Sequence, residues 1–288
     1  MTSDVVAVVK SMHVNKFFLL FTLLLGCGLF FLPCPLRADD SKPPDKVEQL
    51  AKEAGRDAEY LFLSVLKPDR KTVVAAGGIV AATGLLVLFD DDIRDFFQEN
   101  QTDALTDLSD CLGTIGSAKS VLLGNMALLG AGYWIRDDKA GDKLLRAALV
   151  STEAQLFTEG LTVLLKFAVG RERPDKGKGH GKTSFKPFQG FDRSLPSGHA
   201  ARAFAVAAVF ADRYGHPVPF AAYSAAALIG LSRVYQDDHF ASDVFAGAAL
   251  GFAVGKALSR RHADSESRWS VLPFVSKSCA GLSVRFTF

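Results

Sequence analysis

Two histidines and an aspartate in the second half of the chain have the types and spacing of nucleophilic and acid–base groups. His239 and Asp243 are four residues apart, so on a helix the carboxylate can reach the imidazole ring. A carboxylate on one ring nitrogen fixes the tautomer and leaves the other nitrogen as a nucleophile. His199 lies 40 residues earlier and could protonate a leaving oxygen. A surface His–Asp pair and a surface histidine are the alternatives.

The segment just before His199 predicts a helix N-terminus that could bind an anion. In Pro196-Ser197-Gly198-His199, Ser197 has the type of a helix cap. The free N–H groups of a first turn attract anions, and Gly198 lets an anion approach the backbone closely. An ordinary capped helix explains the segment equally well.

Three cations lie near these groups in the sequence. Lys166 and Arg173 are seven residues apart, so a continuing helix places both on one face, and Pro174 then stops it. Arg233 lies six residues before His239. Arginine binds phosphate through two parallel hydrogen bonds, so this set suits an anionic oxygen cluster. Solvated charges at a helix C-terminus are the alternative.

Together the three segments resemble the motifs of the type 2 phosphatidic acid phosphatase and vanadium haloperoxidase superfamily. The shared pattern is K-x6-R-P, then P-S-G-H, then S-R-x5-H-x3-D, and all its polar positions match in order and spacing. The resemblance covers roughly residues 70–258. Two departures are Leu195, where the family often has an aromatic residue, and Asp237-Asp238 before His239. These aspartates either cap the last helix or add negative charge that bears on which substrate is tolerated.

The resemblance implies a helical-bundle phosphatase that needs no metal or other cofactor. By analogy, His239 attacks phosphorus to form a phosphohistidine, and Asp243 orients His239. His199 protonates the leaving group and then activates water. The resemblance assigns the phosphoryl oxygens to Lys166, Arg173, Ser197, Gly198 and Arg233. Vanadate is expected as an inhibitor that mimics phosphate.

The region between the first two motifs indicates the kind of substrate. Residues 175–193 interleave cations with aromatic rings: Lys176, Lys178, Lys182, Lys186 and Arg193 with Phe185, Phe188 and Phe191. Such a mixture suits a headgroup at a membrane interface, although a solvated loop explains it as well. A phosphorylated lipid is therefore expected, such as phosphatidate, phosphatidylglycerol phosphate, an isoprenyl pyrophosphate or a lipid A phosphate. A small periplasmic phosphomonoester, cleaved by a soluble nonspecific acid phosphatase, comes second.

Other functions are compatible with parts of the sequence. A vanadate-dependent haloperoxidase would use the same residues, but such enzymes are typically larger. The apolar run before Asp90-Asp91-Asp92 imitates the strand and nucleophile of haloacid-dehalogenase-type phosphatases, yet it is too long for one strand. A membrane structural protein is the non-enzymatic alternative, and complete motifs argue against it. A net charge of +2 gives no field that would attract nucleic acid.

Long apolar segments predict an all-α fold with about six core helices, possibly embedded in a membrane. The expected helices are 72–89, 117–135, 143–170, 199–213, 217–235 and 240–258. Gly247, Gly251 and Gly255 recur every fourth residue, which places them on one face for close helix contact. We expect a polar helical segment at 39–71, a phosphatase domain at 72–259 and a tail at 260–288.

The N-terminus has the layout of an export signal. Lys10 and Lys16 precede an apolar run at 17–32, so residues 1–38 are expected to form a signal peptide or an anchor. The segment around Cys27 also resembles a lipoprotein processing site. The protein is therefore expected in the inner membrane with a periplasm-facing site, or in the periplasm.

The charge pattern of the loops conflicts with a simple exported leader. Residues 90–110 are acidic and residues 136–146 are basic, so the positive-inside rule puts 136–146 in the cytoplasm and the 171–198 loop outside. A leader that exports residue 39 inverts this arrangement if every helix spans. The sequence leaves this conflict open.

The C-terminal tail and the cysteines complete the expectations. Residues 282–288 alternate apolar and polar side chains, and with 269–275 they predict one β-hairpin. Cys111 and Cys279 could form a disulfide or remain buried thiols. No CxxC spacing occurs, so zinc is not expected.

Overall fold

The computed structural model describes residues 56, 57, 59, 60, 68–176, 184–265, 269–275 and 280–286. The expected leader and lipidation site, most of the 39–71 segment, Lys178, Lys182 and Cys279 lie outside these residues. The signal peptide therefore stays a prediction. Cys111 is a free, exposed thiol, so the structure supports neither the disulfide nor a buried thiol at this position.

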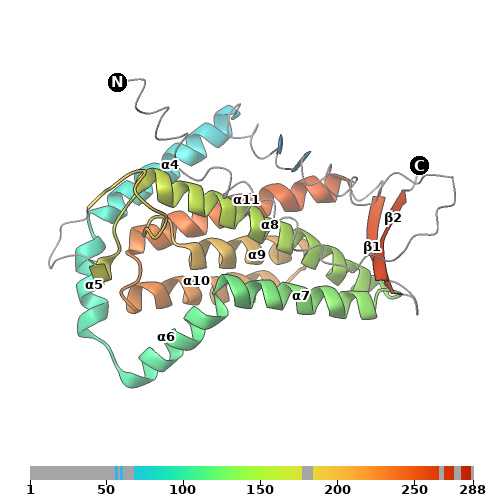
Figure 1. Cartoon of the computed structure of the whole chain (residues 1–288), viewed down its shortest axis with the longest axis horizontal. Helices are drawn as coiled ribbons and strands as arrows, with labels where there is room; N and C mark the ends of the chain where they lie inside the picture. Colours follow the sequence, from blue (N-terminus) through green and yellow to red (C-terminus); the bar gives the residue numbers. More distant parts are fainter. Residues whose placement is uncertain are drawn as a thin grey trace. The chain divides into compact units, whose positions relative to one another are not determined.

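The described residues form the predicted all-α fold (Figure 1). The eight α-helices in this part of the chain are α4 (Arg70–Val87), α5 (Asp90–Glu99), α6 (Asp103–Ile115), α7 (Ala118–Trp134), α8 (Lys139–Val169), α9 (Gly198–Arg213), α10 (Val218–Tyr235) and α11 (Ala241–Ser265). The six expected helices are all present, with ends within a few residues of the predicted ones except that α11 continues to Ser265. The division at residue 259 remains a prediction.

Helices α5 and α6 were not expected from the sequence, which showed only an acidic stretch there. Three aspartates occupy the first turn of α5, where negative charge stabilises the positive end of the helix dipole. Thr102 caps α6 by accepting a hydrogen bond from the N–H of Leu105. Negative charge in the first turn of α5 and the Thr102 cap of α6 thus favour two helices that are each too short to span a membrane alone.

Helix α9 is the centre of the bundle and packs against α8, α10 and α11. A methyl group at Gly247 or Gly251 would collide with the carbonyl oxygens of Ser197 and Ala201 on α9. The backbones of α9 and α11 are therefore in direct contact, as the glycine spacing predicts. Alanines of α9 fill the remaining space in the core.

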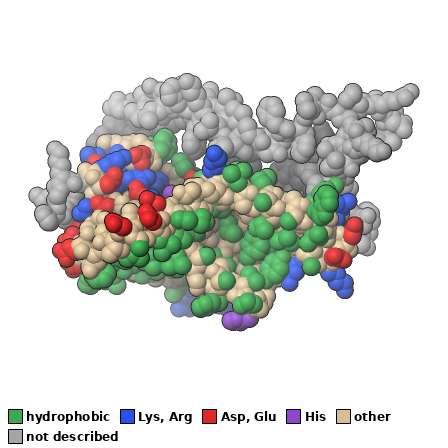
Figure 2. Space-filling view, turned by 90° about the horizontal axis from the view of Figure 1, so that it is seen from below, with side chains coloured by type: hydrophobic (Ala, Val, Ile, Leu, Met, Phe, Trp, Pro, Cys, Tyr) green, Lys and Arg blue, Asp and Glu red, His purple; other side chains and the backbone are tan. Residues whose placement is uncertain are grey.

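Three described helices are long and apolar enough to cross a membrane, namely α4, α10 and α11. The pair α6 and α7, bent by 61°, would make a fourth span. No residue of α4 is buried, and Val74 and Val80 are about 70 % exposed. Figure 2 shows hydrophobic side chains over the middle of the helical body and most charged ones toward its two ends. An exposed apolar surface of this extent is unfavourable in water, so the distribution places the protein in a membrane.

The C-terminal strands β1 (Trp269–Val275) and β2 (Ala280–Phe286) form a two-stranded sheet, as the alternating pattern predicts. They belong to a compact unit distinct from the helices.

Candidate active site

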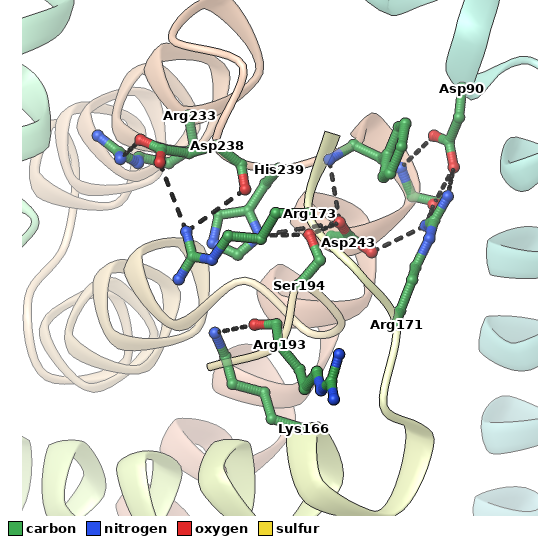
Figure 3. A network of polar contacts seen from close by, with 12 residues as sticks. Asp90, Lys166, Arg171, Arg173, Arg193, Ser194, Arg233, Asp238, His239 and Asp243 are labelled. Carbon is green, nitrogen blue, oxygen red and sulfur yellow. Dashed lines mark hydrogen bonds and ion pairs between the residues drawn. The ribbon is translucent and has the colours of Figure 1, made fainter. Parts of the chain in front are cut away.

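Four helix ends meet at one end of the bundle and hold seven of the eight residues expected from the sequence, and Arg173 lies on an extended segment beside them. Lys166 lies in the last turn of α8, and Arg233 lies in the last turn of α10. Ser197, Gly198 and His199 begin α9, whereas His239 and Asp243 flank the start of α11. Figure 3 shows Lys166, Arg173, Arg233, His239 and Asp243 grouped around one region.

The helix that carries Lys166 does not continue to Arg173, contrary to the expectation from their spacing. Gly170 ends α8 in the left-handed conformation, with φ of 68°, and its N–H bonds back to the carbonyl of Lys166. A side chain here would collide with the carbonyl of Lys186 and would also be strained, so glycine fits this turn. Arg173 reaches the site from an extended segment instead.

Residues 184–194 pair with that extended segment and place further groups at the site. The N–H of Glu172 donates to Ser184, and the N–H of Ser194 donates to the carbonyl of Arg171. Lys166 Nζ donates to the carbonyl of Arg193 at 2.6 Å. Burial and the neighbouring Arg173 lower the pKa of Lys166 to about 8. This shift shows that positive charge is concentrated in a poorly hydrated place.

The start of α9 offers hydrogen-bond donors to an anion. Ser197 occupies the expected N-cap position but makes no side-chain cap bond. Its hydroxyl is fully buried and has no partner among the described residues. The first helical bond of this turn is donated by Ala201, so the preceding N–H groups are those left open at a helix start. A buried unpaired hydroxyl is costly, which suggests that a ligand satisfies it.

His239 is buried and meets Asp243 through Ser194 rather than directly. Nδ1 of His239 is 3.7 Å from Oδ2 of Asp243, too far for a hydrogen bond. The hydroxyl of Ser194 lies 3.2 Å from the same nitrogen and donates to Asp243 Oδ2 at 2.5 Å. Burial lowers the pKa of His239 to about 4, so the imidazole is neutral at pH 7. A neutral imidazole is the form that can act as a nucleophile.

A fully buried network holds Asp243 from its other side. Arg171 donates to Asp243 Oδ1 at 2.8 Å and to Asp90 Oδ2 at 2.7 Å. Asp90 in turn accepts from the backbone N–H of Ser242 at 2.9 Å. Because Asp90 is 1 % exposed and fully engaged, it is not available as the nucleophile of a dehalogenase-type phosphatase. This pairing joins residues 81 positions apart, and no local pattern predicts it.

Arg173 and Arg233, the two arginines expected to bind phosphoryl oxygens, both contact Asp238. Arg173 NH1 lies 3.4 Å from Asp238 Oδ1, and Arg233 NH2 pairs with Asp238 Oδ2. Asp237 instead forms a two-pronged ion pair with Arg94 of α5, at 2.5 and 2.6 Å. Neither aspartate makes a side-chain hydrogen bond to the first turn of α11 among the described contacts.

His199 lies beside the cations, in a setting that keeps it neutral. Burial, and then the positive charges of Arg202 and Arg233, lower its pKa to about 3. Gly116 of α6 packs close to the ring, where a methyl group would lie 3.3 Å from Cδ2. A bound phosphate would reverse this electrostatic effect, because an adjacent anion favours the protonated imidazole.

Comparisons with known proteins identify a family. Residues 147–266 match the PAP2 superfamily. A lipid A 1-phosphatase of Porphyromonas gingivalis is 30 % identical over 251 residues, which are 85 % of this chain and 50 % of the relative. Residues 147–266 are a PAP2-superfamily segment.

Further relatives carry the same name. A lipid A 1-phosphatase of Rhizobium etli is 40 % identical over 129 residues, 39 % of this chain and 55 % of that protein. The chain thus spans about half the length of the curated relatives it matches. A transmembrane PAP2-type phosphatidylglycerolphosphate phosphatase from Bacillus subtilis aligns over 65 % of this chain and 95 % of its own, with 21 % identity and a TM-score of 0.48.

The PAP2 match contains the eight expected residues but not Asp90 or α6. Outside the match, α6 contributes to a cavity of about 880 Å³ that opens beside Arg233 and Asp238. Its other lining residues include Asp110, Thr114, Ser117 and Gln236. The aromatic rings of the 184–193 loop lie near the PAP2 motifs, where Phe188 and Phe191 pack on Phe167 and stay about half exposed or more.

One described cluster outside the PAP2 motifs has the spacing of metal ligands: Asp57, Glu153 and His262. His262 lies 19 residues after Asp243 on α11, about 28 Å away by helix rise. Its Nε2 is 2.8 Å from Glu153 and 3.4 Å from Asp57, which also pairs with Arg261. The cluster is a group of ion pairs, remote from the residues expected to bind the phosphoryl oxygens.

Proposed function

We propose that this chain is a metal-independent phosphatase that hydrolyses a phosphate monoester or pyrophosphate of a membrane lipid through a phosphohistidine on His239. One observation carries the proposal: the buried His239 is linked through Ser194 to Asp243 and lies close to the positive charges of Lys166 and Arg173. A nucleophile without charge of its own, facing a set of fixed donors, suits attack on an anionic phosphoryl group.

In the first step, Nε2 of His239 attacks phosphorus and the bond to the leaving oxygen breaks. The leaving oxygen takes a proton from His199. Because His199 is neutral beforehand, this proton enters the site with a monoanionic substrate or is taken up as the phosphate binds. Asp243, held by Arg171 and Ser194, stabilises the positive charge that develops on the imidazole of His239.

In the second step, His199 removes a proton from water, and the resulting hydroxide attacks phosphorus. The bond to His239 breaks and releases inorganic phosphate. Throughout, the phosphoryl oxygens are held by Lys166, Arg173 and Arg233, together with Ser197 and the backbone N–H of Gly198. These fixed positive charges neutralise the negative charge of the phosphoryl oxygens, as metal ions do in other phosphatases, so no cofactor is required.

The substrate proposed first is lipid A 1-phosphate. Two of the matched relatives are named for that reaction, and the chain has membrane-type helices and exposed aromatic rings beside the motifs. Phosphatidate, phosphatidylglycerol phosphate and isoprenyl pyrophosphates are the lipids to compare with it. Neither a haloperoxidase nor a soluble acid phosphatase is favoured by these findings.

We further propose that the site faces the periplasm of the inner membrane and that residues 1–38 are not a simple leader that exports residue 39. The acidic helix α5 lies at the site end, whereas the basic connection after α7 lies at the other end of α8. By the positive-inside rule, the basic end faces the cytoplasm.

The test is phosphate release by the full chain purified in mild detergent with EDTA present. Lipid A, phosphatidate and p-nitrophenyl phosphate are compared, with His239→Ala as the control. Release that resists EDTA, is inhibited by vanadate and is lost in His239→Ala supports the proposal. A trapped phosphoenzyme that is labile in acid and stable in alkali, as a phosphorus–nitrogen bond is, identifies the intermediate. Activity that requires added Mg²⁺, or that survives in His239→Ala, rules out the mechanism.

A further inference from the structure

We propose that Asp238 is an internal counter-ion that occupies the phosphoryl-binding position and must leave before substrate binds, so that it sets anion affinity and substrate choice. The proposal rests on the proposed function, because it takes Arg173 and Arg233 as ligands of the phosphoryl group.

The carboxylate of Asp238 lies between two arginines. Its Oδ1 faces Arg173 NH1 at 3.4 Å, and its Oδ2 pairs with Arg233 NH2 (Figure 3). The two oxygens thus bridge two arginines from different segments of the chain. Two oxygens of a phosphoryl group held by the same arginines would take the same places, since both anions accept from the guanidinium fork.

The other described carboxylates near these arginines have other partners. Asp110, which acts on Arg233 from α6, accepts a hydrogen bond from Gln236. Asp243 is held by Arg171 and Ser194. Asp192 accepts from Arg173 Nε at 3.1 Å, but it is 64 % exposed and also binds Lys176. Within the described residues, Asp238 is therefore the carboxylate that contacts both Arg173 and Arg233.

Electrostatics explains why a counter-ion is present. Lys166, Arg173 and Arg233 converge in a partly buried place, where like charges repel strongly because water screens them little. The lowered pKa of Lys166 reflects this repulsion together with burial. A carboxylate between the arginines offsets that repulsion until a phosphoryl group replaces it.

The surroundings of Asp238 allow it to leave while the nucleophile stays in place. Its side chain is 30 % exposed and lines the cavity of about 880 Å³ beside Arg233, so it can rotate into a hydrated space. The neighbouring Asp237 is fixed by its ion pair with Arg94, and His239 is 3 % exposed. The change required is a rotation of one side chain rather than a movement of the loop.

Competition of this kind favours substrates with additional binding contacts. A small phosphate ester must displace Asp238 with its phosphoryl group alone, whereas a lipid also gains contacts through the rest of the molecule. We therefore expect Asp238 to disfavour soluble phosphomonoesters and to promote release of inorganic phosphate.

The experiment measures binding of inorganic phosphate and of orthovanadate to the full chain in detergent at pH 7, by calorimetry. Asp238→Asn is expected to bind both anions about 10- to 100-fold more tightly, because the competing charge-assisted bonds to two arginines are lost. Asp175→Asn, which removes an equal charge from an exposed position near Arg173, is expected to change affinity less than about threefold. In turnover, Asp238→Asn should raise the rate with p-nitrophenyl phosphate at a concentration below its KM, whereas the rate with a saturating concentration of the lipid should change less.

Unchanged or weaker anion binding by Asp238→Asn overturns the inference, since it means that Asp238 positions the arginines. An equal rise in anion affinity in Asp175→Asn also overturns the inference, because the change in net charge alone would then explain the higher affinity of Asp238→Asn. Asp238→Ala is measured in parallel, and a folded Asp238→Ala with wild-type affinity also counts against competition. Binding that follows the expected pattern in a chain without hydrolytic activity would refute the proposed function but not the role of Asp238.

Discussion

The hydroxyl oxygen of Ser194 lies 3.2 Å from Nδ1 of His239. It is closer to this nitrogen than Asp243 Oδ2, which is 3.7 Å away. Ser194 therefore connects the carboxylate of Asp243 to the imidazole of His239. Ser194 lies three residues before Ser197, the N-cap of α9. The ring of His239 is oriented by a hydroxyl that is itself held by a carboxylate.

Replacing Ser194 by Ala is expected to lower kcat by about 10- to 100-fold, the effect of losing one hydrogen bond to a group that becomes charged. KM should change little, because Ser194 does not contact the proposed phosphoryl position. Ser194→Thr keeps the hydroxyl and should recover part of the activity. Steady-state rates and the acid limb of the pH profile are the measurements. Equal rates for wild type and Ser194→Ala would show that Asp243 acts without this connection.

Replacing Asp90 by Asn is expected to destabilise the fold by about 3 kcal/mol, because a fully buried Arg171 loses half of its charge compensation. For a chain of this size the unfolding temperature in detergent should fall by roughly 6–12 °C. Asp92→Asn, an exposed aspartate on the same helix, is the matched control and should leave the temperature within about 2 °C. A small effect in both variants would mean that the Arg171 network adds little stability.

The pH dependence of kcat/KM is expected to have an acidic maximum, between about pH 4 and about pH 6. Below the pKa of His239, about 4, the nucleophile is protonated and activity falls. Above the second ionisation of a phosphate monoester, about 6, neither the substrate nor the neutral His199 carries the proton that the leaving oxygen needs. His199→Asn should lose less activity with p-nitrophenyl phosphate, whose leaving group needs little protonation. A maximum above pH 8 would contradict this assignment.

The orientation of the site can be read from labelling of single exposed positions in intact cells. A cysteine at Asp92, at the site end, is expected to react with a membrane-impermeant maleimide. A cysteine at Lys139, at the start of α8, should react only after permeabilisation. The labelling of the unmodified chain is subtracted, since it has four native cysteines. The reverse pattern would place the site on the cytoplasmic side.

The long helices were predictable because their apolar runs are local in the sequence. The N-cap position of Ser197 and the close contact along Gly247 and Gly251 were also predictable, since both depend on spacing within one helix. Helices α5 and α6 were missed because they are short and acidic, and because their role depends on packing against α10 and α11.

The parts of the site that escaped prediction all involve contacts between distant segments. The pairing of Arg171 with Asp90 and the bridging by Asp238 depend on how helix ends meet in space. The extended path to Arg173 was missed for a different reason. The spacing of Lys166 and Arg173 suggested a continuing helix, but Gly170 between them is a helix-ending signal that outweighs it.

The direct backbone contact between α9 and α11 bears on the shape of molecule this protein can process. Because glycines bring the two helices together without intervening side chains, no hydrophobic tail can pass between them to reach His239. A lipid must therefore reach His239 by a path that avoids the interface between α9 and α11.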